Sequence, residues 1–126
     1  MEYKNAVDAL LAVSPHLVDQ DAVTVADWGN GDGPVPEIHR VGELGSAFAS
    51  LVNDMSDREK TGIALVVEQF MNADQHSRDV MGTGFIEAVV AEIENGRASL
   101  DDVAPVLGPR SKEYLLAWGD FECGDA

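Results

Sequence analysis

The spacing of apolar residues along the chain predicts an all-α fold. Apolar side chains recur at intervals of three and four residues through most of the sequence, which is typical of amphipathic helices packed around one core. The expected helices cover approximately residues 2–13, 36–55, 56–71, 77–95, 99–107 and 109–118. We therefore predict a compact orthogonal bundle of about five or six helices.

Residues with capping preferences mark several of the expected helix boundaries. Ser56 and Glu59 have the spacing of a capping box, in which the serine caps a backbone amide and the glutamate reaches back to the cap residue. Pro36 suits the first turn of a helix, and Glu37 follows it near the positive helix end. Residues 82–84 (Gly-Thr-Gly) interrupt the fourth helix, and the pattern leaves open whether that helix kinks or breaks.

The helical pattern disappears between residues 20 and 35. Residues 28–34 of this stretch are dense in glycine, asparagine and aspartate, which favour turns. We expect one long Gly-rich loop at residues 20–35 and a polar, frayed tail at residues 119–126. Because no linker separates two apolar regions, residues 1–126 are expected to form a single domain.

The sequence also indicates where the two tryptophans lie relative to the core. We expect Trp118 to pack in the core, because it continues the apolar face of the last helix. Trp28 falls in the expected loop and suits either a core position or an exposed position in an interface.

The charge balance changes the functional picture. The chain has 23 Asp and Glu residues against 8 Lys and Arg, which gives a formal net charge of −15. Such a field repels nucleic acids and anionic membranes, and it accelerates association with basic surfaces. The sequence thus argues against direct nucleic-acid or membrane binding and for a basic partner, although solubility alone also accounts for an acidic composition.

Cysteine usage and hydropathy indicate the compartment. Cys123 is the only cysteine, which excludes an intramolecular disulfide and a cysteine-based zinc cluster. The first residues lack the basic stretch and apolar run of a signal peptide, and no apolar segment approaches the ~20 residues of a membrane span. These features predict a cytoplasmic protein.

No recognisable metal or cofactor motif is present. The three histidines are far apart in the sequence, and none belongs to a His-Glu-x-x-His arrangement. Asp27, Asn30 and Asp32 superficially suggest a calcium loop, but Ile38 stands where an EF-hand has its bidentate glutamate. We therefore expect no metal site and no cofactor.

The acidic residues offer one position of chemical interest. Paired carboxylates can perform acid–base chemistry when one is buried, but solvated helix faces are the simpler interpretation of these residues. Glu87 is the exception, because its neighbours in sequence are strongly apolar. We expect a protein without catalytic residues; a deep pocket containing Glu87 with a raised pKa would instead indicate an enzyme.

Several short segments in the second half carry a family resemblance. They are Val67-Glu68-Gln69-Phe70, Thr83-Gly84-Phe85-Ile86-Glu87, Leu107-Gly108-Pro109-Arg110-Ser111, Tyr114-Leu115 and Trp118. Over about residues 41–121 the chain resembles a group of small, helical, acidic and largely uncharacterised bacterial proteins of the toxin-immunity type. The resemblance implies an α-helical fold and a binding role, and it supplies no catalytic residues.

Charge and resemblance together lead to one functional expectation. An immunity-type protein binds a basic toxin and blocks its active site, and enzymes that act on polyanions need positive clefts, to which an acidic protein is complementary. We expect the contact surface to combine acids with an aromatic anchor. The candidate partner-binding residues are Trp28, Asp27, Asp32 and Glu37.

Two other binding roles stay open. A nucleic-acid-mimicking inhibitor of a defence protein would carry acids in rows, whereas the acids here are scattered over all helices. A homodimeric structural or regulatory adaptor would instead use an apolar face to form a homo-oligomer.

Overall fold

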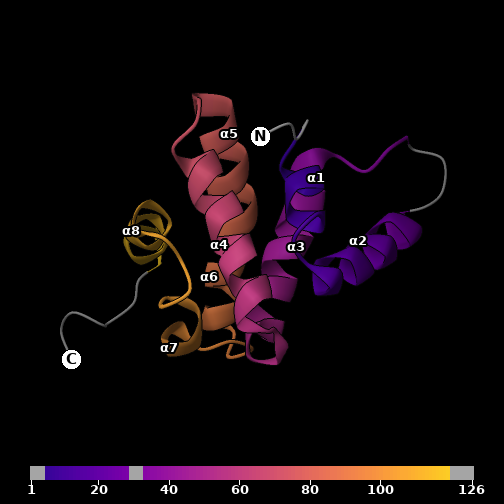
Figure 1. The fold of residues 1–126 in the computed structure, drawn as a ribbon. Helices are drawn as coiled ribbons and strands as arrows, with labels where there is room; N and C mark the ends of the chain where they lie inside the picture. Colours follow the sequence, from indigo (N-terminus) through magenta and orange to yellow (C-terminus); the bar gives the residue numbers. More distant parts are fainter. Residues whose placement is uncertain (1–4, 29–32, 120–126) are drawn as a thin grey trace.

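The computed structural model describes residues 5–28 and 33–119, and all its regular elements are helical (Figure 1). In chain order they are α1 (Ala6–Leu11), α2 (Pro15–Trp28), α3 (Glu37–Leu51), the 3-10 helix η1 (Val52–Asp54), α4 (Asp57–Met71), α5 (Gln75–Asp79), the π-helix η2 (Val80–Ile86), α6 (Glu87–Glu94), α7 (Leu100–Val103) and α8 (Pro109–Trp118). Because no strand occurs within the described ranges, the prediction of an all-α fold is confirmed there. Of the expected frayed tail, only Gly119 belongs to the described residues.

Helix α3 is the central element of the bundle. Its main contacts are with α2, η2 and α6, and Figure 1 shows α2 at the periphery, beyond α3 from α6 and α8. The buried apolar side chains of the helices form one cluster. At its centre the rings of Phe48 on α3 and Phe85 on η2 lie 5.5 Å apart, tilted against each other.

A glycine makes the contact between α3 and η2 possible. A Cβ atom on Gly45 would lie only 2.3 Å from the carbonyl oxygen of Phe85, so the two backbones approach more closely than any side chain would allow. This approach brings the Phe48 and Phe85 rings together across the contact.

The expected interruption at residues 82–84 is not a break. Helices α5, η2 and α6 follow one another without a gap from Gln75 to Glu94, and the Gly-Thr-Gly triplet lies inside the π-helical segment. A π-helix is wider than an α-helix because its hydrogen bonds span five residues. The conformational freedom of glycine accommodates this change of pitch without ending the helix.

The prediction of a loop over residues 20–35 is wrong for residues 20–28, which belong to α2. Helix α2 departs from the usual burial of apolar residues and exposure of polar ones. Its buried residues are Leu17, Asp21 and Thr24, while its exposed large apolar residues are Val18, Val23, Val25 and Trp28. Residues 29–32 lie outside the described part, and residues 33–36 are non-helical. Counting α3 with η1 as one helix, and α5, η2 and α6 as another, the described residues contain seven helices, and α2 is the helix that the apolar pattern did not predict.

The expectation that Trp118 lies in the core is also wrong. Trp118 is 56% exposed and stacks on Tyr114 one turn earlier in α8, with ring centroids 6.4 Å apart and planes 11° from parallel. Leu115 is the residue of α8 that enters the core.

Three glutamates cap the N-termini of helices other than their own. Their carboxylates accept hydrogen bonds from backbone amides as follows: Glu37 from Ala6 of α1, Glu59 from His16 of α2, and Glu68 from Arg110 and Ser111 of α8. The first amides of a helix have no partner within the helix, and a negative charge there also opposes the positive end of the helix dipole. Part of the acidic excess of the chain is therefore structural.

Candidate functional site

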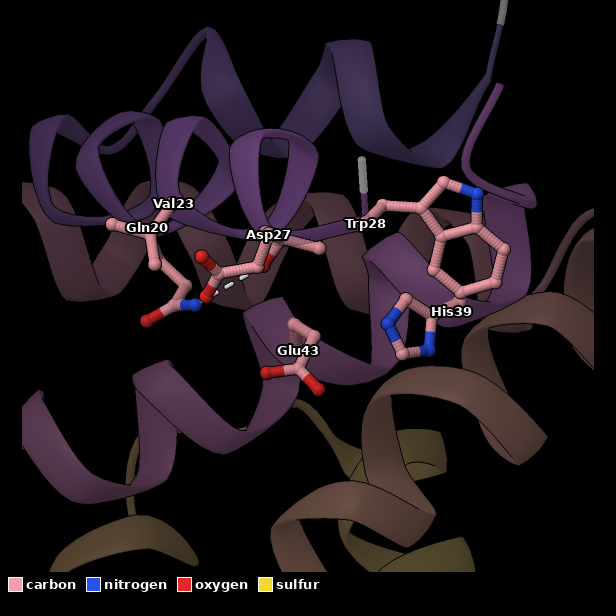
Figure 2. Close-up of a pocket in the computed structure, with 7 residues that line it drawn as sticks. Gln20, Val23, Asp27, Trp28, His39 and Glu43 are labelled. Atoms are coloured by element: carbon pink, nitrogen blue, oxygen red, sulfur yellow. Dashed lines mark hydrogen bonds between the residues drawn. The ribbon is translucent and has the colours of Figure 1, made fainter. Parts of the chain in front are cut away.

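A hollow of about 220 Å³ lies between α2 and α3 (Figure 2). The residues that line it are Gln20, Val23, Thr24, Asp27, Trp28, His39 and Glu43. Positions 20, 23, 24, 27 and 28 recur along one side of α2, and positions 39 and 43 are one turn apart on α3. Helical spacing places each set on one side of its helix, and the packing of α2 against α3 brings the two sets together.

The hollow has a polar end and an aromatic end. Figure 2 shows the carboxylates of Asp27 and Glu43 on the same side as Gln20, whereas Trp28 and His39 lie together at the other side. The rings of Trp28 and His39 are 5.0 Å apart and tilted by 47°. At the polar end, Nε2 of Gln20 donates a hydrogen bond of 3.1 Å to Oγ1 of Thr24. Apolar contact and carboxylate oxygens are thus available within one small volume.

Exposure and charge suit this hollow to a cationic group. Trp28 is 38% exposed and Val23 is 53% exposed, so both can be covered by a partner. Two of the seven lining residues are acids and none is Lys or Arg. A positively charged side chain in the hollow would meet carboxylates at one end and an aromatic ring at the other.

A two-pronged ion pair fixes α2 against α3, the two helices that line the hollow. Nε of Arg40 donates to Oδ1 of Asp21 over 3.0 Å, and Nη2 of Arg40 donates to Oδ2 of the same carboxylate. The Asp21 side chain is almost fully buried, whereas Arg40 remains partly exposed. The planar guanidinium matches both carboxylate oxygens, so this contact restrains orientation as well as distance.

The N-terminus of α2 is anchored to α4 through Glu59. Oγ of Ser14 accepts a hydrogen bond from the amide of Leu17 and donates one to the carboxylate of Glu59. The same carboxylate lies 2.9 Å from Nδ1 of His16. Burial acts to raise the pKa of Glu59, but the hydrogen bonds from Ser14 and His16 outweigh it and hold the pKa below its ordinary value.

The capping box at Ser56 is confirmed only in its first half. The hydroxyl of Ser56 accepts from the amide of Glu59 over 3.1 Å, as expected. The Glu59 side chain does not complete the box, because it binds Ser14 and His16 instead. The glutamate therefore joins two helices and does not close the end of its own.

The structure brings two of the four expected partner-binding residues to the hollow. Asp27 and Trp28 line it. Glu37 lines a different hollow, where its carboxylate accepts from the amide of Ala6 over 3.2 Å and lies 3.9 Å from Nε2 of His76. Asp32 lies outside the described residues. Glu37 therefore does not line the hollow with Trp28, and its part in partner binding stays a prediction.

The sequence pattern missed five of the seven residues that line the hollow. Gln20, Val23 and Thr24 were missed because the predicted loop covers residues 20–28, which belong to α2. On α3, the acidic Glu43 follows His39 by four residues, which places both on one face of a helix. The four-residue spacing of His39 and Glu43 was the sequence feature that could have indicated the α3 side of the hollow. The α2 side could have been predicted only if residues 20–28 had been recognised as helical.

Glu87 has an ordinary structural environment. It is half-buried, and its carboxylate accepts a hydrogen bond of 3.3 Å from the hydroxyl of Tyr114. Burial raises the pKa of Tyr114, and the adjacent charge of Glu87 raises it further. This contact accounts for the position of Glu87 beside the apolar core.

The described ranges contain neither a cluster of metal ligands nor a helix suited to crossing a membrane. Within residues 5–28 and 33–119, no group of three His, Cys, Asp or Glu side chains is arranged to hold a metal ion. None of the helices there combines the length and apolarity that crossing a membrane requires. Comparison of the chain with protein-family models, with curated proteins and with solved structures finds no match.

Proposed function

We propose that this chain is an immunity-type protein that binds a basic toxin and neutralises it by blocking its active site. The observation that carries the proposal is the outer surface of α2, where apolar side chains and carboxylates are exposed together beside the hollow. Helix α2 contains three aspartates and no Lys or Arg, and it buries only three of its 14 residues. We infer that the partner covers this surface.

The energetics favour an interface over a purely solubilising surface. Exposed valines at 45–53% and a partly exposed tryptophan contribute apolar area that gains free energy when a partner removes it from water. The surrounding negative charge accelerates encounter with a positive surface and discriminates against acidic partners. Because Arg40 and Glu59 fix α2 in place, little conformational entropy would be lost on binding.

A capture experiment followed by a toxicity assay tests the proposal. The tagged chain is incubated with lysate of its native host, washed at low and then at moderate salt, and retained proteins are identified by mass spectrometry. We expect one basic protein to be retained at moderate salt. When that protein is expressed alone in a bacterial host it should arrest growth, and coexpression of this chain should restore growth.

A matched pair of variants decides whether α2 is the contact surface. Val23→Arg places a positive charge in the hollow, and Val25→Arg makes the same charge change on a similarly exposed residue that does not line it. Val23→Arg should abolish capture and rescue, while Val25→Arg should retain more of both. If no captured protein is toxic, the immunity role is wrong. If both variants rescue fully, α2 is not the interface.

The homodimeric adaptor is retained as a second candidate because of one observation. Leu65 on α4 is 64% exposed, and Leu116 and Trp118 are exposed on α8, which packs against α4. Burying these side chains in a symmetric interface would form a dimer. Sedimentation equilibrium should then give twice the monomer mass, and Trp118→Ser should return the chain to a monomer.

A further inference from the structure

We infer that the hollow between α2 and α3 accepts an arginine side chain of the partner. This inference rests on the proposed function, in which the partner is a basic protein, and it specifies the chemistry by which that partner is recognised. Its basis is the arrangement of two carboxylates and an aromatic pair within about 220 Å³.

The lining supplies the contacts that a guanidinium needs. Asp27 comes from α2 and Glu43 from α3, and Figure 2 shows both carboxylates at the polar end of the hollow. A guanidinium there can donate several N–H groups to carboxylate oxygens. The side-chain amide of Gln20 lies at the same end, where its nitrogen donates to Oγ1 of Thr24.

The aromatic end selects the shape of the cation. The Trp28 ring lies against His39 and remains partly exposed, so a flat delocalised cation can stack on it. The methylene stem of an arginine would cover Val23 at the side of the hollow. A lysine ammonium is more strongly hydrated and lacks a planar surface, and it would therefore gain less from the same environment. An anionic ligand is disfavoured by both acids.

The structure already contains an internal example of the same pairing. Arg40 of α3 binds Asp21 of α2 in a two-pronged contact between the two helices that line the hollow. The partner arginine would add a second guanidinium–carboxylate contact between the same helices. Because it would touch residues of both helices, its binding also depends on the spacing that the Arg40 contact sets.

Peptide titration tests the inference. In a Trp118→Phe background Trp28 is the only tryptophan, so its fluorescence reports on the hollow alone. The probes are two glycine–serine peptides that differ only in carrying one arginine or one lysine. We expect the arginine peptide to change the Trp28 emission and to bind about tenfold more tightly than the lysine peptide. Backbone amide NMR shifts should concentrate on the residues lining the hollow.

A charge-matched control separates the hollow from the general acidity of the chain. The double variant Asp27→Asn with Glu43→Gln should weaken the arginine peptide about tenfold and remove its advantage over lysine. The double variant Asp101→Asn with Asp102→Asn changes the net charge equally at another hollow and should leave that advantage intact. Equal binding of both peptides, or equal loss in both double variants, would overturn the inference.

The result is distinguishable from that of the capture experiment. If a toxic basic protein is captured through α2 but the peptides show no arginine preference, the proposed function stands and this inference is wrong. If the arginine preference is found but no toxic protein is captured, the hollow binds arginine and the immunity role is wrong.

Discussion

Helix α3 makes two contacts of opposite chemical character. Towards η2 it packs backbone against backbone, with Gly45 under the carbonyl of Phe85 and two phenylalanine rings in contact. Towards α2 it uses an ion pair between Arg40 and Asp21 and leaves a hollow beside it. The contact with η2 leaves no room for a side chain at position 45, whereas the contact with α2 leaves room for a ligand.

This difference separates the parts of the molecule that stabilise the fold from the part available for recognition. Close-packed apolar contacts tolerate little change of volume, because neighbouring atoms must move to accept any addition. A polar contact beside a hollow can exchange solvent for a partner without repacking the core. We therefore expect substitutions on the η2 side of α3 to affect stability most, and those on the α2 side to affect binding most.

Gly45→Ala should give the largest loss of stability. Its Cβ would lie 2.3 Å from the Phe85 carbonyl oxygen, which forces the two helices apart and should cost about 2 kcal/mol or more in the free energy of unfolding. Gly42→Ala is the matched control, because its Cβ would meet the Gly84 carbonyl at an ordinary 3.6 Å. The control should be neutral or up to about 1 kcal/mol more stable through helix propensity. Urea unfolding followed by circular dichroism measures both, and equal losses would contradict the close-contact argument.

Asp21→Asn should give the next largest loss. It removes the charge that Arg40 binds at an almost fully buried position, and we expect a loss of about 1 to 2 kcal/mol, moderated by the solvent exposure of Arg40. Asp57→Asn, which alters a fully exposed partner of Lys60 in the first turn of α4, should lower the urea midpoint far less. If the two variants were equally stable, the ion pair would not contribute to holding α2.

Glu59→Gln should lower stability in a pH-dependent manner. The pKa of Glu59 is lowered in the folded state, so its carboxylate stabilises the fold above the ordinary value of 4.5, and this contribution is lost as the pH falls through the folded-state pKa. We expect the variant to be about 1 kcal/mol less stable at pH 7 and the difference from wild type to narrow below that ordinary value. Urea titrations between pH 7 and pH 3 measure this; Glu113→Gln, on an exposed position of α8, serves as the control. A difference that stayed constant with pH would rule out a role for the charge.

The two sides of α3 also explain what could be predicted from the sequence. Helix α4 has the usual pattern of an amphipathic helix, with Ser56 as its cap and Ile63, Val67 and Met71 on its buried face. Helix α2 departs from that pattern, because Asp21 is buried and Val23 is exposed. Burying an aspartate costs free energy unless a partner binds its charge, and here the partner is Arg40 of another helix. The pattern of residues around Asp21 therefore does not indicate the pairing.

The boundary of α2 was hidden for a related reason. Ser14 and Pro15 end the preceding apolar pattern, but they also suit the cap and first residue of a new helix. The structure uses them in that way, and Ser14 accepts from the amide of Leu17. Because the apolar periodicity does not resume after Pro15, the apolar pattern indicates the end of one helix but not the start of the next. The candidate site was therefore only half predicted, through Asp27 and Trp28.

Val23→Arg should have the smallest effect on stability, within about 0.5 kcal/mol, because this side chain is more than half exposed. Controls aside, however, Val23→Arg should weaken arginine-peptide binding most among the four variants. It places a positive charge and a long side chain in the hollow that we propose binds a cation. Val25→Arg makes the same charge change on the same helix, outside the lining of the hollow. Urea unfolding and arginine-peptide titration of both variants therefore separate folding from recognition. Unchanged stability with selective loss of peptide binding in Val23→Arg would locate recognition on the α2 side of α3. Loss of stability in Val23→Arg alone would instead mean that the hollow belongs to the fold.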